Sequence, residues 1–311
     1  MKVENGVVLV TGAAGFVGSA VVERLVRQGV QVRALVHRVG VAPGVEAVPG
    51  DLARPVSLRG LCEGVTSVLH LGARVGGTLQ ECRAVNVEGT RALLVEAERA
   101  GVRRIVQLGT AAVYGDGVHR GVVEGELAEV PGSVTSVTRL AGERLVLAAG
   151  GTVLRPHLVY GRGDRWVVPA LVELLARLPY WVDGGRARTS LTSVEALAGA
   201  LAELAVGHRV VGGVLHAGHP EPVCARELVE TVTRELGLPL PAGDIDLPGA
   251  LALLGGAGEP DAVTRRRVGL LAVDHWYDSG RLWGQLEASP GPRFTEGFAR
   301  CADWYRATAV T

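Results

Sequence analysis

Three glycines at regular spacing, between a predicted strand and a predicted helix, constrain the fold of this chain more than any other feature. Residues 11–18 read TGAAGFVG and place Gly12, Gly15 and Gly18 three residues apart. Gly12 and Gly15 would allow a tight turn and a close approach of the backbone to a ligand, and Gly18 would let the helix pack against the strand. The start of that helix offers free N–H donors and the positive end of its dipole. An ordinary turn in a chain with 44 glycines is the alternative, but the flanking elements favour a cradle for a pyrophosphate.

Short β-type runs alternate with helical stretches over the first 160 residues. The predicted strands cover residues 7–10, 30–36, 67–70, 104–108 and 152–154, and the predicted helices cover residues 16–28, 79–100 and 137–149. Strand–helix alternation at this spacing implies right-handed crossovers, and therefore a parallel sheet with helices on both faces. We predict an α/β fold with a doubly wound parallel sheet.

The pattern loosens after residue 155, where prolines and glycines interrupt it. The later predicted elements are a helix near 194–206 and a strand near 213–216, which return to the sheet, a helix at 227–236, and a loop or short helices over 239–260. The predicted division is a dinucleotide-binding domain of residues 1–160, with returns near 190–218, and a smaller α/β part for the substrate, formed by C-terminal insertions at 161–189 and 219–311.

Charge balance and cysteine pattern exclude several classes of protein. The chain has 32 basic and 32 acidic side chains, so it lacks the basic excess typical of nucleic-acid binding. Its four cysteines form no CxxC pair, so we predict no disulfide framework and no metal site. The uncharged stretch 6–22 contains glycines and leads into a charged helix, unlike a signal peptide, and the apolar stretch 247–258 is too short to span a bilayer. We expect a cytoplasmic protein without membrane or nucleic-acid partners.

Further segments along the chain strengthen the interpretation of residues 11–18. They are DL at 51–52, HLGA at 70–73, NVEGT at 86–90, GTAAVYG at 109–115, RLAGE at 139–143, LRP at 154–156, VYG at 159–161 and DWY at 303–305. In this order and spacing, the segments resemble the extended short-chain dehydrogenase/reductase family, which includes NAD-dependent epimerases and dehydratases. The resemblance implies a Rossmann domain with NAD(P) bound across the carboxyl ends of the strands.

The resemblance also implies which residues contact the cofactor. In that family Asp51 would contact the adenine, residues 70–73 would line the cofactor, and residues 156–158 would lie along the nicotinamide. The implied cofactor-binding residues are Gly12, Ala14, Gly15, Phe16, Val17, Gly18, His37, Arg38, Asp51, Leu52, Leu71, Gly72, Ala73, Arg139, Pro156 and Leu158.

The residues after the second predicted strand favour NADP(H) over NAD(H). About twenty residues beyond the glycine turn, an NAD-binding Rossmann fold offers an acid to the ribose 2′-hydroxyl. This chain offers His37 and Arg38 instead, and no Asp or Glu occurs between Glu23 and Glu46. A guanidinium can hold a 2′-phosphate, which a carboxylate would repel. The alternative is that Arg38 is an ordinary solvated residue and that both cofactors bind.

The chain departs from the family at its catalytic pair. The resemblance implies a Tyr-x-x-x-Lys motif, with Tyr as general acid/base and Lys on the nicotinamide ribose. The alignment fixed by residues 139–143 puts Thr135 at the Tyr position and Arg139 at the Lys position. The chain contains a single lysine, Lys2, and has no tyrosine between Tyr114 and Tyr160. Because a threonine hydroxyl has no useful pKa near neutrality, Thr135 cannot serve as a comparable acid.

Three side chains are the predicted catalytic candidates. Thr110 matches the family's Ser/Thr that hydrogen-bonds the substrate carbonyl, although it could simply end a strand. Arg139 would hold the ribose in place of Lys, and His157 is a candidate for proton exchange near the nicotinamide. His119 is a weaker candidate, and either histidine could be purely structural. Asn86 matches a residue that supports the family's Lys, and we predict a packing or capping role for it here.

The missing pair leaves three hypotheses about function. The first is an atypical NADPH-dependent ketoreductase that reduces a ring ketone of an aromatic polyketide, angucyclinone-like, in antibiotic biosynthesis, with help from the substrate's own hydroxyl or from water. The second is a sugar-nucleotide epimerase or dehydratase, for which Arg162, Arg165, Arg186 and Arg188 are available to a diphosphate. The third is a non-catalytic NADP-binding sensor or scaffold. The sequence does not distinguish a monomer from a homodimer that pairs through helices 79–100 and 137–149.

Overall fold

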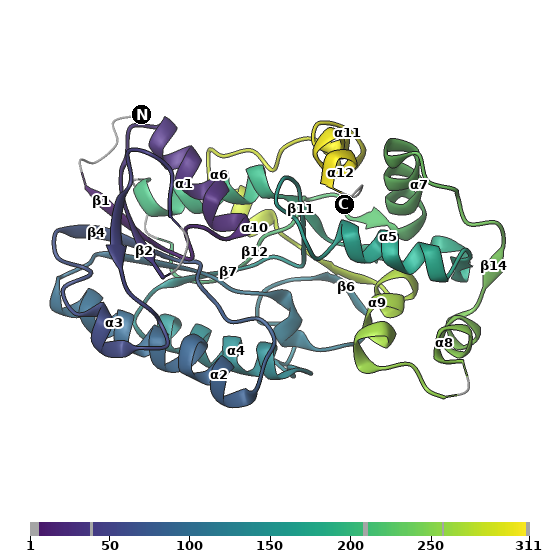
Figure 1. Ribbon diagram of the computed structural model, residues 1–311, viewed down its shortest axis with the longest axis horizontal. Coiled ribbons are helices and arrows are strands. Elements are labelled where there is room, and N and C mark those ends of the chain that lie inside the picture. The colour runs from purple at the N-terminus through teal and green to yellow at the C-terminus, as the bar shows by residue number, and fades with distance from the viewer. Residues whose placement is uncertain (1–5, 38–39, 208–210, 257, 309–311) are drawn as a thin grey trace.

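The computed structural model describes residues 6–37, 40–207, 211–256 and 258–308. Its largest feature is a seven-stranded sheet in the order β12-β7-β5-β4-β1-β2-β3, in which every neighbouring pair is parallel (Figure 1). The strands are β1 (Val7–Thr11), β2 (Gln31–Val36), β3 (Glu46–Pro49), β4 (Val65–His70), β5 (Arg104–Leu108), β7 (Thr152–Arg155) and β12 (Gly213–His216). The predicted doubly wound α/β fold is confirmed. The order reverses between β1 and β4, the place where ligands bind in such sheets.

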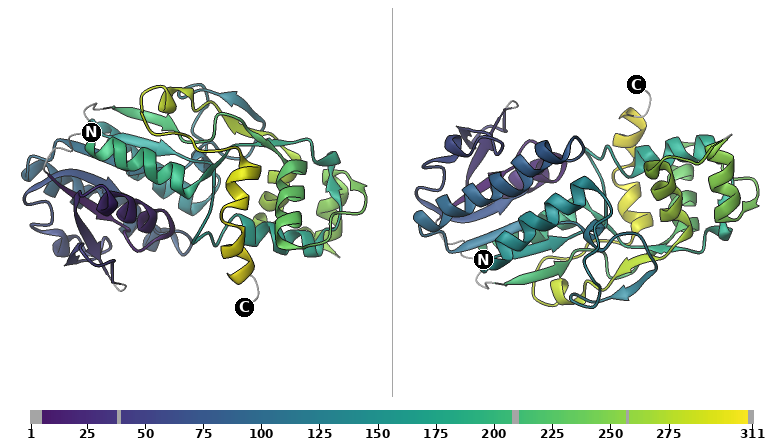
Figure 2. Two further views of the ribbon diagram at one scale, coloured as in Figure 1. Left: turned by 90° about the horizontal axis from the view of Figure 1, so that it is seen from above. Right: turned by 90° about the horizontal axis from the view of Figure 1, so that it is seen from below.

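Helices cover both faces of this sheet, as Figures 1 and 2 show. One face carries α1 (Phe16–Arg27) and α6 (Val194–Val206), and the other carries α2 (Leu79–Arg83), η2 (Ala84–Gly89), α3 (Thr90–Arg99) and α4 (Val134–Ala148). The central strands β1, β4 and β7 are mostly buried, as expected for a covered parallel sheet, whereas β3 at the edge is largely exposed. The core on the first face joins strands to both helices through Val10, Val21, Leu25, Leu69, Leu197 and Leu201.

The predicted helix 79–100 is present, but its middle turn, η2, is a π-helix. Helix α4 packs closely against η2. A Cβ on Gly142 would lie 2.2 Å from the carbonyl oxygen of Asn86, so only glycine fits at this contact. The hydroxyl of Thr90 donates to that same oxygen at 2.8 Å. The wide turn therefore brings α4 and the segment after β4 together at the carboxyl edge of the sheet.

A smaller part lies at one end of the sheet and is drawn mostly in green in Figure 1. Its four-stranded sheet has the order β13-β10-β15-β6 and contains β6 (His119–Val122), β10 (Arg188–Thr189), β13 (Val223–Cys224) and β15 (His275–Tyr277). Two further pairs join β8 (Leu158–Tyr160) to β11 (Leu191–Ser193) and β9 (Trp181–Val182) to β14 (Asp244–Ile245). Because β6 pairs with β15, a segment from early in the chain is tied to the C-terminal region.

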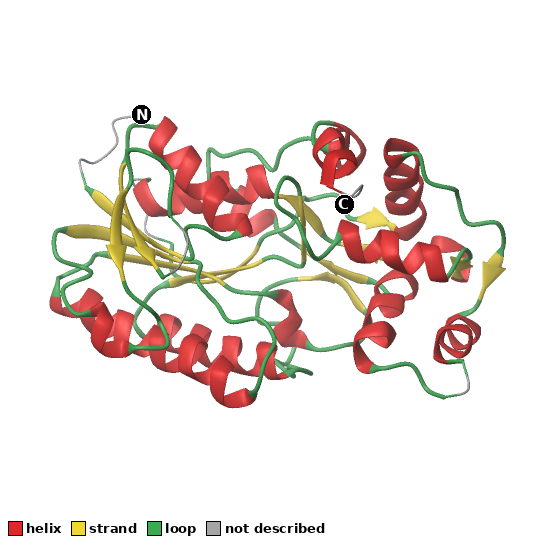
Figure 3. Ribbon diagram, viewed as in Figure 1, coloured by secondary structure: helices red, strands yellow, loops and turns green. Residues whose placement is uncertain are grey.

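Figure 3 shows the helices that complete the structure. They are α5 (Val168–Arg177), α7 (Ala225–Leu236), α8 (Leu247–Gly255), α9 (Ala262–Ala272), α10 (Gly280–Trp283), α11 (Phe294–Ala299) and α12 (Ala302–Thr308), with 3-10 turns η1 (Pro55–Leu58), η3 (Ala111–Tyr114) and η4 (Asp183–Gly185). Within the described ranges, no helix combines the length and apolar character needed to cross a bilayer. The same ranges contain no cluster of His, Cys, Asp or Glu suited to a metal ion.

Candidate active site

The glycine turn between β1 and α1 has the geometry that its spacing predicts. Gly12 has φ +70°, and a Cβ there would lie 2.6 Å from the backbone nitrogen of Gly72. A Cβ on Gly18 would lie 2.0 Å from the carbonyl oxygen of Gly12. At Gly15 an added Cβ would meet only that oxygen, at 3.2 Å. Packing within the chain therefore requires Gly12 and Gly18, whereas the open space beside Gly15 suits a ligand.

A cavity of about 680 Å³ extends from this turn across the carboxyl ends of β1, β2 and β4. The residues implied by the family resemblance that line it are Gly12, Ala14, Gly15, His37, Asp51, Leu52, Gly72 and Ala73. The other described members of that set, which are Phe16, Val17, Gly18, Leu71, Arg139, Pro156 and Leu158, are not among its lining residues. The cavity is lined by the glycine turn at the helix N-terminus and by Asp51, which suits the phosphates and the adenosine of a dinucleotide.

Buried hydrogen bonds fix the wall of this cavity. The hydroxyl oxygen of Thr11 accepts from the backbone N–H of Gly72 at 3.1 Å and lies 2.8 Å from Nδ1 of His70. Nε2 of His70 lies 2.8 Å from the hydroxyl of Thr90. Burial lowers the pKa of His70 to about 4, so its ring is neutral at physiological pH. His70 therefore holds the segment after β4 against the glycine turn as a structural residue.

At the far end of the cavity, Nε2 of His37 lies 3.4 Å from a carboxylate oxygen of Asp51. The other oxygen of Asp51 accepts a hydrogen bond from the backbone N–H of Ala53 at 2.9 Å. His37 and Asp51 therefore lie together where the resemblance places the adenosine. Arg38, the second predicted contact to a 2′-phosphate, lies outside the described residues.

The three predicted catalytic residues lie on segments that hydrogen bonds join where β5 and β7 end. Thr110 follows β5 and begins η3, and its hydroxyl oxygen accepts from the backbone N–H of Ala112 at 3.2 Å. Arg139 donates through Nη2 to the carbonyl oxygens of Leu108 and Gly109, at 2.8 and 2.7 Å. The backbone N–H of Ala111 donates to the carbonyl oxygen of Pro156 at 2.9 Å, which joins this segment to His157.

A buried ion-pair network supports Thr110 from behind. The carboxylate of Glu143 accepts from the backbone N–H of Thr110 at 3.1 Å and from Nε of Arg155 at 2.8 Å. Arg155 also pairs with Glu129 and donates to the hydroxyl oxygen of Tyr114 at 2.9 Å. Burial raises the pKa of Glu143, and the adjacent Arg155 opposes that shift. The sequence interpretation placed Glu143 and Arg155 in family motifs but gave them no role.

Thr135, at the family's Tyr position, has a structural partner. Its hydroxyl oxygen accepts a hydrogen bond from the backbone N–H of Gly76 at 3.0 Å. Nearby, the side chain of Asn86 accepts from the backbone N–H of Arg74 at 2.8 Å and donates to the carbonyl oxygen of that residue at 3.0 Å. Both residues therefore hold the segment after β4 against α2 and α4, in agreement with the structural role predicted for Asn86.

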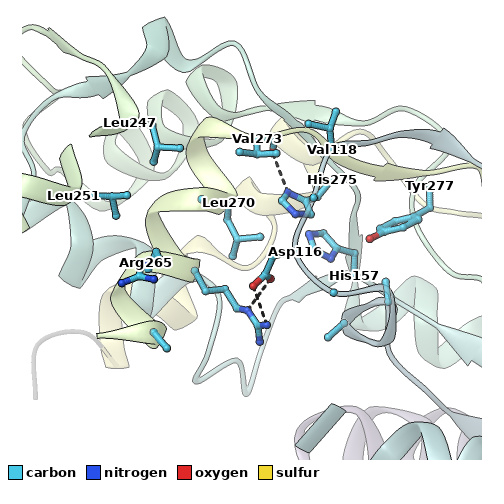
Figure 4. A pocket seen from close by; sticks show the side chains of 17 residues that line it. Asp116, Val118, His157, Leu247, Leu251, Arg265, Leu270, Val273, His275 and Tyr277 are labelled. Atoms are coloured by element: carbon cyan, nitrogen blue, oxygen red, sulfur yellow. Dashed lines mark hydrogen bonds and ion pairs between the residues drawn. The ribbon is translucent and has the colours of Figure 1, made fainter. Parts of the chain in front are cut away.

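A second cavity, of about 560 Å³, lies between the two parts of the molecule (Figure 4). Ala111 and Ala112, which follow Thr110, form one side of it. Its apolar walls come mainly from α8 and α9, through Leu247, Leu251, Leu270 and Val273. Its polar lining includes His157, His275, Tyr277, Arg265 and an ion pair in which Arg266 donates to Asp116 at 3.1 Å. An adjoining cavity of about 260 Å³ shares His157 and Leu270 with it and is lined mainly by leucines and Trp166.

His157 is a neutral hydrogen-bond acceptor or donor in this structure. Burial, with smaller contributions from His275 and His119, lowers its pKa to about 3. Its ring is parallel to that of His275 within 9°, with 5.6 Å between the centroids. Nε2 of His157 is buried and has no hydrogen-bond partner among the described residues. Because an unpaired buried nitrogen is unfavourable, a polar group of a ligand is the expected partner.

The sequence interpretation missed Tyr277 and His275, and treated His119 as a minor candidate. All three lie close together because β15 pairs with β6, although His119 and Tyr277 are 158 residues apart in the sequence. The short segment HWY at 275–277 carries no periodic pattern. A parallel pairing between such short strands leaves no signal in one sequence.

Comparisons with known proteins agree with this architecture. The profile of the NAD dependent epimerase/dehydratase family matches residues 8–205. The chain is 33% identical over 324 residues to a 2-alkyl-3-oxoalkanoate reductase of Stenotrophomonas maltophilia, covering 94% of this chain and 97% of the relative. It is 30% identical over 259 residues to a 4-hydroxy-2-methyl-3-oxo-4-farnesyl-3,4-dihydroquinoline-1-oxide ketoreductase of Stigmatella aurantiaca, covering 78% of this chain and 77% of that protein.

Solved structures show the same fold. MoeE5 in complex with UDP-glucose and NAD superposes with a TM-score of 0.74 at 28% identity, over 98% of this chain and 100% of MoeE5. A short-chain dehydrogenase/reductase superfamily protein from Agrobacterium tumefaciens with bound NAD gives a TM-score of 0.76 at 24% identity, over 98% of each chain.

Proposed function

The chain belongs to the NAD-dependent epimerase/dehydratase family, and we propose that it is an NADPH-dependent ketoreductase that reduces a ring ketone of an aromatic polyketide, angucyclinone-like, to a secondary alcohol. The observation that carries this proposal is the apolar cavity lined by His157 and by Ala111, the residue after Thr110, with its adjoining leucine-lined cavity. A flat polycyclic ketone could fill both spaces. The relatives that act on 3-oxoalkanoate and quinoline-oxide ketones support carbonyl reduction as the reaction class.

The residues present fit a bound nicotinamide dinucleotide. Its phosphates would lie on the turn at Gly15, and its adenosine beside His37 and Asp51. When bound, the reduced nicotinamide supplies a hydride. Thr110 would donate its hydroxyl hydrogen to the substrate carbonyl, since its oxygen already accepts from Ala112. Arg139 would fix the end of β5 through Nη2 and offer its other N–H groups to the ribose.

The substrate itself would supply part of the catalysis. Negative charge grows on the ketone oxygen as hydride reaches the carbonyl carbon, and Thr110 offers a single neutral hydrogen bond. A hydroxyl on the adjacent ring of the substrate, within hydrogen-bond reach of that oxygen, is a preorganised donor with high effective molarity. This hydroxyl stabilises the charge through its hydrogen bond, and the proton that the product gains is ultimately supplied by water.

A matched pair of substrates tests this proposal. A polycyclic ketone with the adjacent hydroxyl should be reduced at least roughly tenfold faster than its O-methyl ether, which corresponds to about 1.4 kcal/mol in the barrier. Steady-state rates should be compared after the Kd of each compound has been measured. Equal rates for two equally well-bound compounds would exclude assistance by the substrate.

We also propose that NADPH binds more tightly than NADH, because His37 and Arg38 replace the acid that would hold a ribose 2′-hydroxyl. Arg38→Asp should weaken NADPH binding by roughly tenfold or more, since a charge-assisted hydrogen bond contributes about 1.5–3 kcal/mol. Its effect on NADH binding should be small. Fluorescence titration of both cofactors measures this, and equal affinities in the unmodified protein would contradict it.

The sugar-nucleotide alternative finds less support. Similar structures bind UDP-sugars, and their diphosphates need cationic partners. Among the described residues, the four arginines Arg162, Arg165, Arg186 and Arg188 are absent from the lining of the 560 Å³ cavity. Arg265 and Arg266, which line it, are paired with Glu259 and Asp116. A non-catalytic sensor would bind NADPH without oxidising it, which the ketone assay distinguishes directly.

A further inference from the structure

The five tyrosines of this chain all lie within the described residues, and they have different surroundings. Tyr160 and Tyr305 belong to the core of the smaller part. Tyr180 is 39% exposed, and Tyr114 is buried with its hydroxyl bonded to Arg155. Tyr277 alone lines the 560 Å³ cavity. The missing family tyrosine therefore has one possible substitute in the substrate space.

Tyr277 lines that cavity from β15. Figure 4 shows its hydroxyl on the side of the ring that faces His157 and His275. Its ring centroid lies 5.7 Å from that of His157, and the ring stacks on Tyr114 at 5.6 Å. The side chain is 5% exposed, so its position is fixed by packing. A phenol held rigidly in a cavity wall can donate a proton without reorganisation.

The hydroxyl of Tyr277 has a histidine behind it. Its oxygen lies 2.8 Å from Nδ1 of His119. The other nitrogen of His119, Nε2, lies beside Gly117, in the exposed turn 116–118. Burial and the nearby His275 lower the pKa of His119, and burial raises the pKa of Tyr277. The resting pair is therefore a neutral imidazole and a neutral phenol that are hydrogen-bonded to each other. The phenol of Tyr277 is on the cavity side, and the imidazole of His119 is on the side of the exposed turn.

The surrounding aromatic cluster leaves this pair free to relay a proton. Nδ1 of His275 lies 2.9 Å from the carbonyl oxygen of Val273, so that nitrogen carries a hydrogen. The hydroxyl of Tyr114 lies 2.8 Å from Nε2 of His216 and accepts from Arg155. These groups are occupied by partners of their own. Tyr277 and His119 are bonded chiefly to each other, which is the arrangement a relay needs.

We propose that Tyr277 is the proton donor to the ketone oxygen, and that His119 returns a proton from solvent to Tyr277. The inference rests on the proposed ketoreductase function. When the carbonyl carbon receives the hydride, the π electron pair moves to oxygen, which takes the proton as the O–H bond of Tyr277 breaks. Nε2 of His119 then takes a proton from water, and Nδ1 passes its own proton to the phenolate. Exchange of protons between His119 and water restores the starting tautomer before the next turnover. One hydride and one proton are consumed for each ketone reduced.

This relay is compatible with help from the substrate's hydroxyl. That hydroxyl stabilises charge on the ketone oxygen, whereas Tyr277 delivers the proton that makes the product an alcohol. Thr135 has no part in it, because its hydroxyl is bonded to the backbone of Gly76. The catalytic tyrosine would thus lie on β15 and not on α4.

Tyr277→Phe tests the donor in the full chain with NADPH and a hydroxylated polycyclic ketone. The kcat should fall by about a hundredfold or more, the usual effect of removing a general acid, while KM and the Kd for NADPH change little. A matched variant, Tyr180→Phe outside the cavity, should keep the kcat of the unmodified protein. A Tyr277→Phe protein with unchanged kcat would overturn the proposal.

His119→Ala tests the relay, and imidazole added to the buffer distinguishes a relay from a structural role. The kcat should fall at least tenfold and recover as imidazole fills the space. His119→Asn, which can still donate to the oxygen of Tyr277 but cannot carry a proton across its ring, should stay slow. A folded His119→Ala protein without any recovery would contradict the relay. A failure of the proposed function would look different, because the unmodified protein would then bind NADPH but would oxidise no NADPH in the presence of any ketone.

Discussion

Replacing Gly15 by Val should abolish cofactor binding and leave the protein folded. The backbone at Gly15 has φ −79° and ψ 173°, which any residue can adopt, and an added Cβ would meet only the carbonyl oxygen of Gly12, at 3.2 Å. The two methyl groups would project toward the 680 Å³ cavity, where the pyrophosphate is expected. Calorimetry with NADPH should detect no binding, while the thermal unfolding midpoint stays close to that of the unmodified protein.

Two other glycines provide controls for this experiment. Gly258 has open space around its Cβ position, so Gly258→Val should change neither folding nor cofactor affinity. Gly18→Ala should instead destabilise the fold, because its Cβ would lie 2.0 Å from a backbone oxygen. Unchanged NADPH affinity in folded Gly15→Val protein would show that residues 11–18 do not hold the phosphates.

Of the substitutions proposed for this protein, Arg155→Met should lower the free energy of unfolding the most. Arg155 is 2% exposed and holds Glu143, which is fully buried, and Glu129. Removal of the guanidinium leaves the Glu143 carboxylate without its counter-charge in a site that water does not reach. Breaking one partner of a buried ion pair lowers the free energy of unfolding by roughly 3–5 kcal/mol. Urea denaturation followed by circular dichroism measures the change.

Arg144 provides the matched control, because it pairs with the same Glu129 at 3.1 Å but is 63% exposed. Arg144→Met should lower the free energy of unfolding by less than about 1 kcal/mol. If both arginine variants lost the same small amount, the network behind Thr110 would not be a buried electrostatic unit. A double variant, Arg155→Met with Glu143→Leu, should recover part of the stability, since no buried charge is left unpaired.

The sequence predicted the parallel sheet well because its signals are local. The glycine turn and the buried runs identify β1, α1 and β5, and the predicted bounds 194–206 and 213–216 coincide with those of α6 and β12. Those segments combine strong periodicity or β-branched residues with clear ends. The wide turn η2 inside the predicted helix 79–100 was not foreseen, because it packs against Gly142 of α4, a contact that the local sequence does not show.

The smaller part was predicted less well, and proline shows why. Pro169 was interpreted as an interruption, but it occupies the first turn of α5, where a missing N–H does no harm. Pro248 lies in the same position in α8, inside the stretch predicted as loop or short helices. A proline at a helix start and a proline in a loop look alike without knowledge of what the next turn packs against.

The site was predicted in its location more than in its chemistry. The sequence predicted Thr110, Arg139 and His157 as catalytic candidates, and hydrogen bonds join the segments that carry them at the ends of β5 and β7. Their catalytic roles stay predictions. It could not show that Nη2 of Arg139 binds backbone carbonyls, because a charge pattern does not distinguish a carbonyl from a ribose hydroxyl. The Tyr277–His119 contact depends on the pairing of two short strands that are far apart in the chain.

Transfer of deuterium from labelled NADPH tests most directly the claim that this chain reduces ketones without the family's tyrosine and lysine. The protein should be incubated with a hydroxylated polycyclic ketone and NADPH dideuterated at C4 of the nicotinamide, and the product examined by mass spectrometry and NMR. We predict a secondary alcohol with one deuterium on the carbinol carbon for each NADPH oxidised. Folded protein that binds NADPH but transfers no deuterium to any of a panel of aromatic ketones would contradict the account.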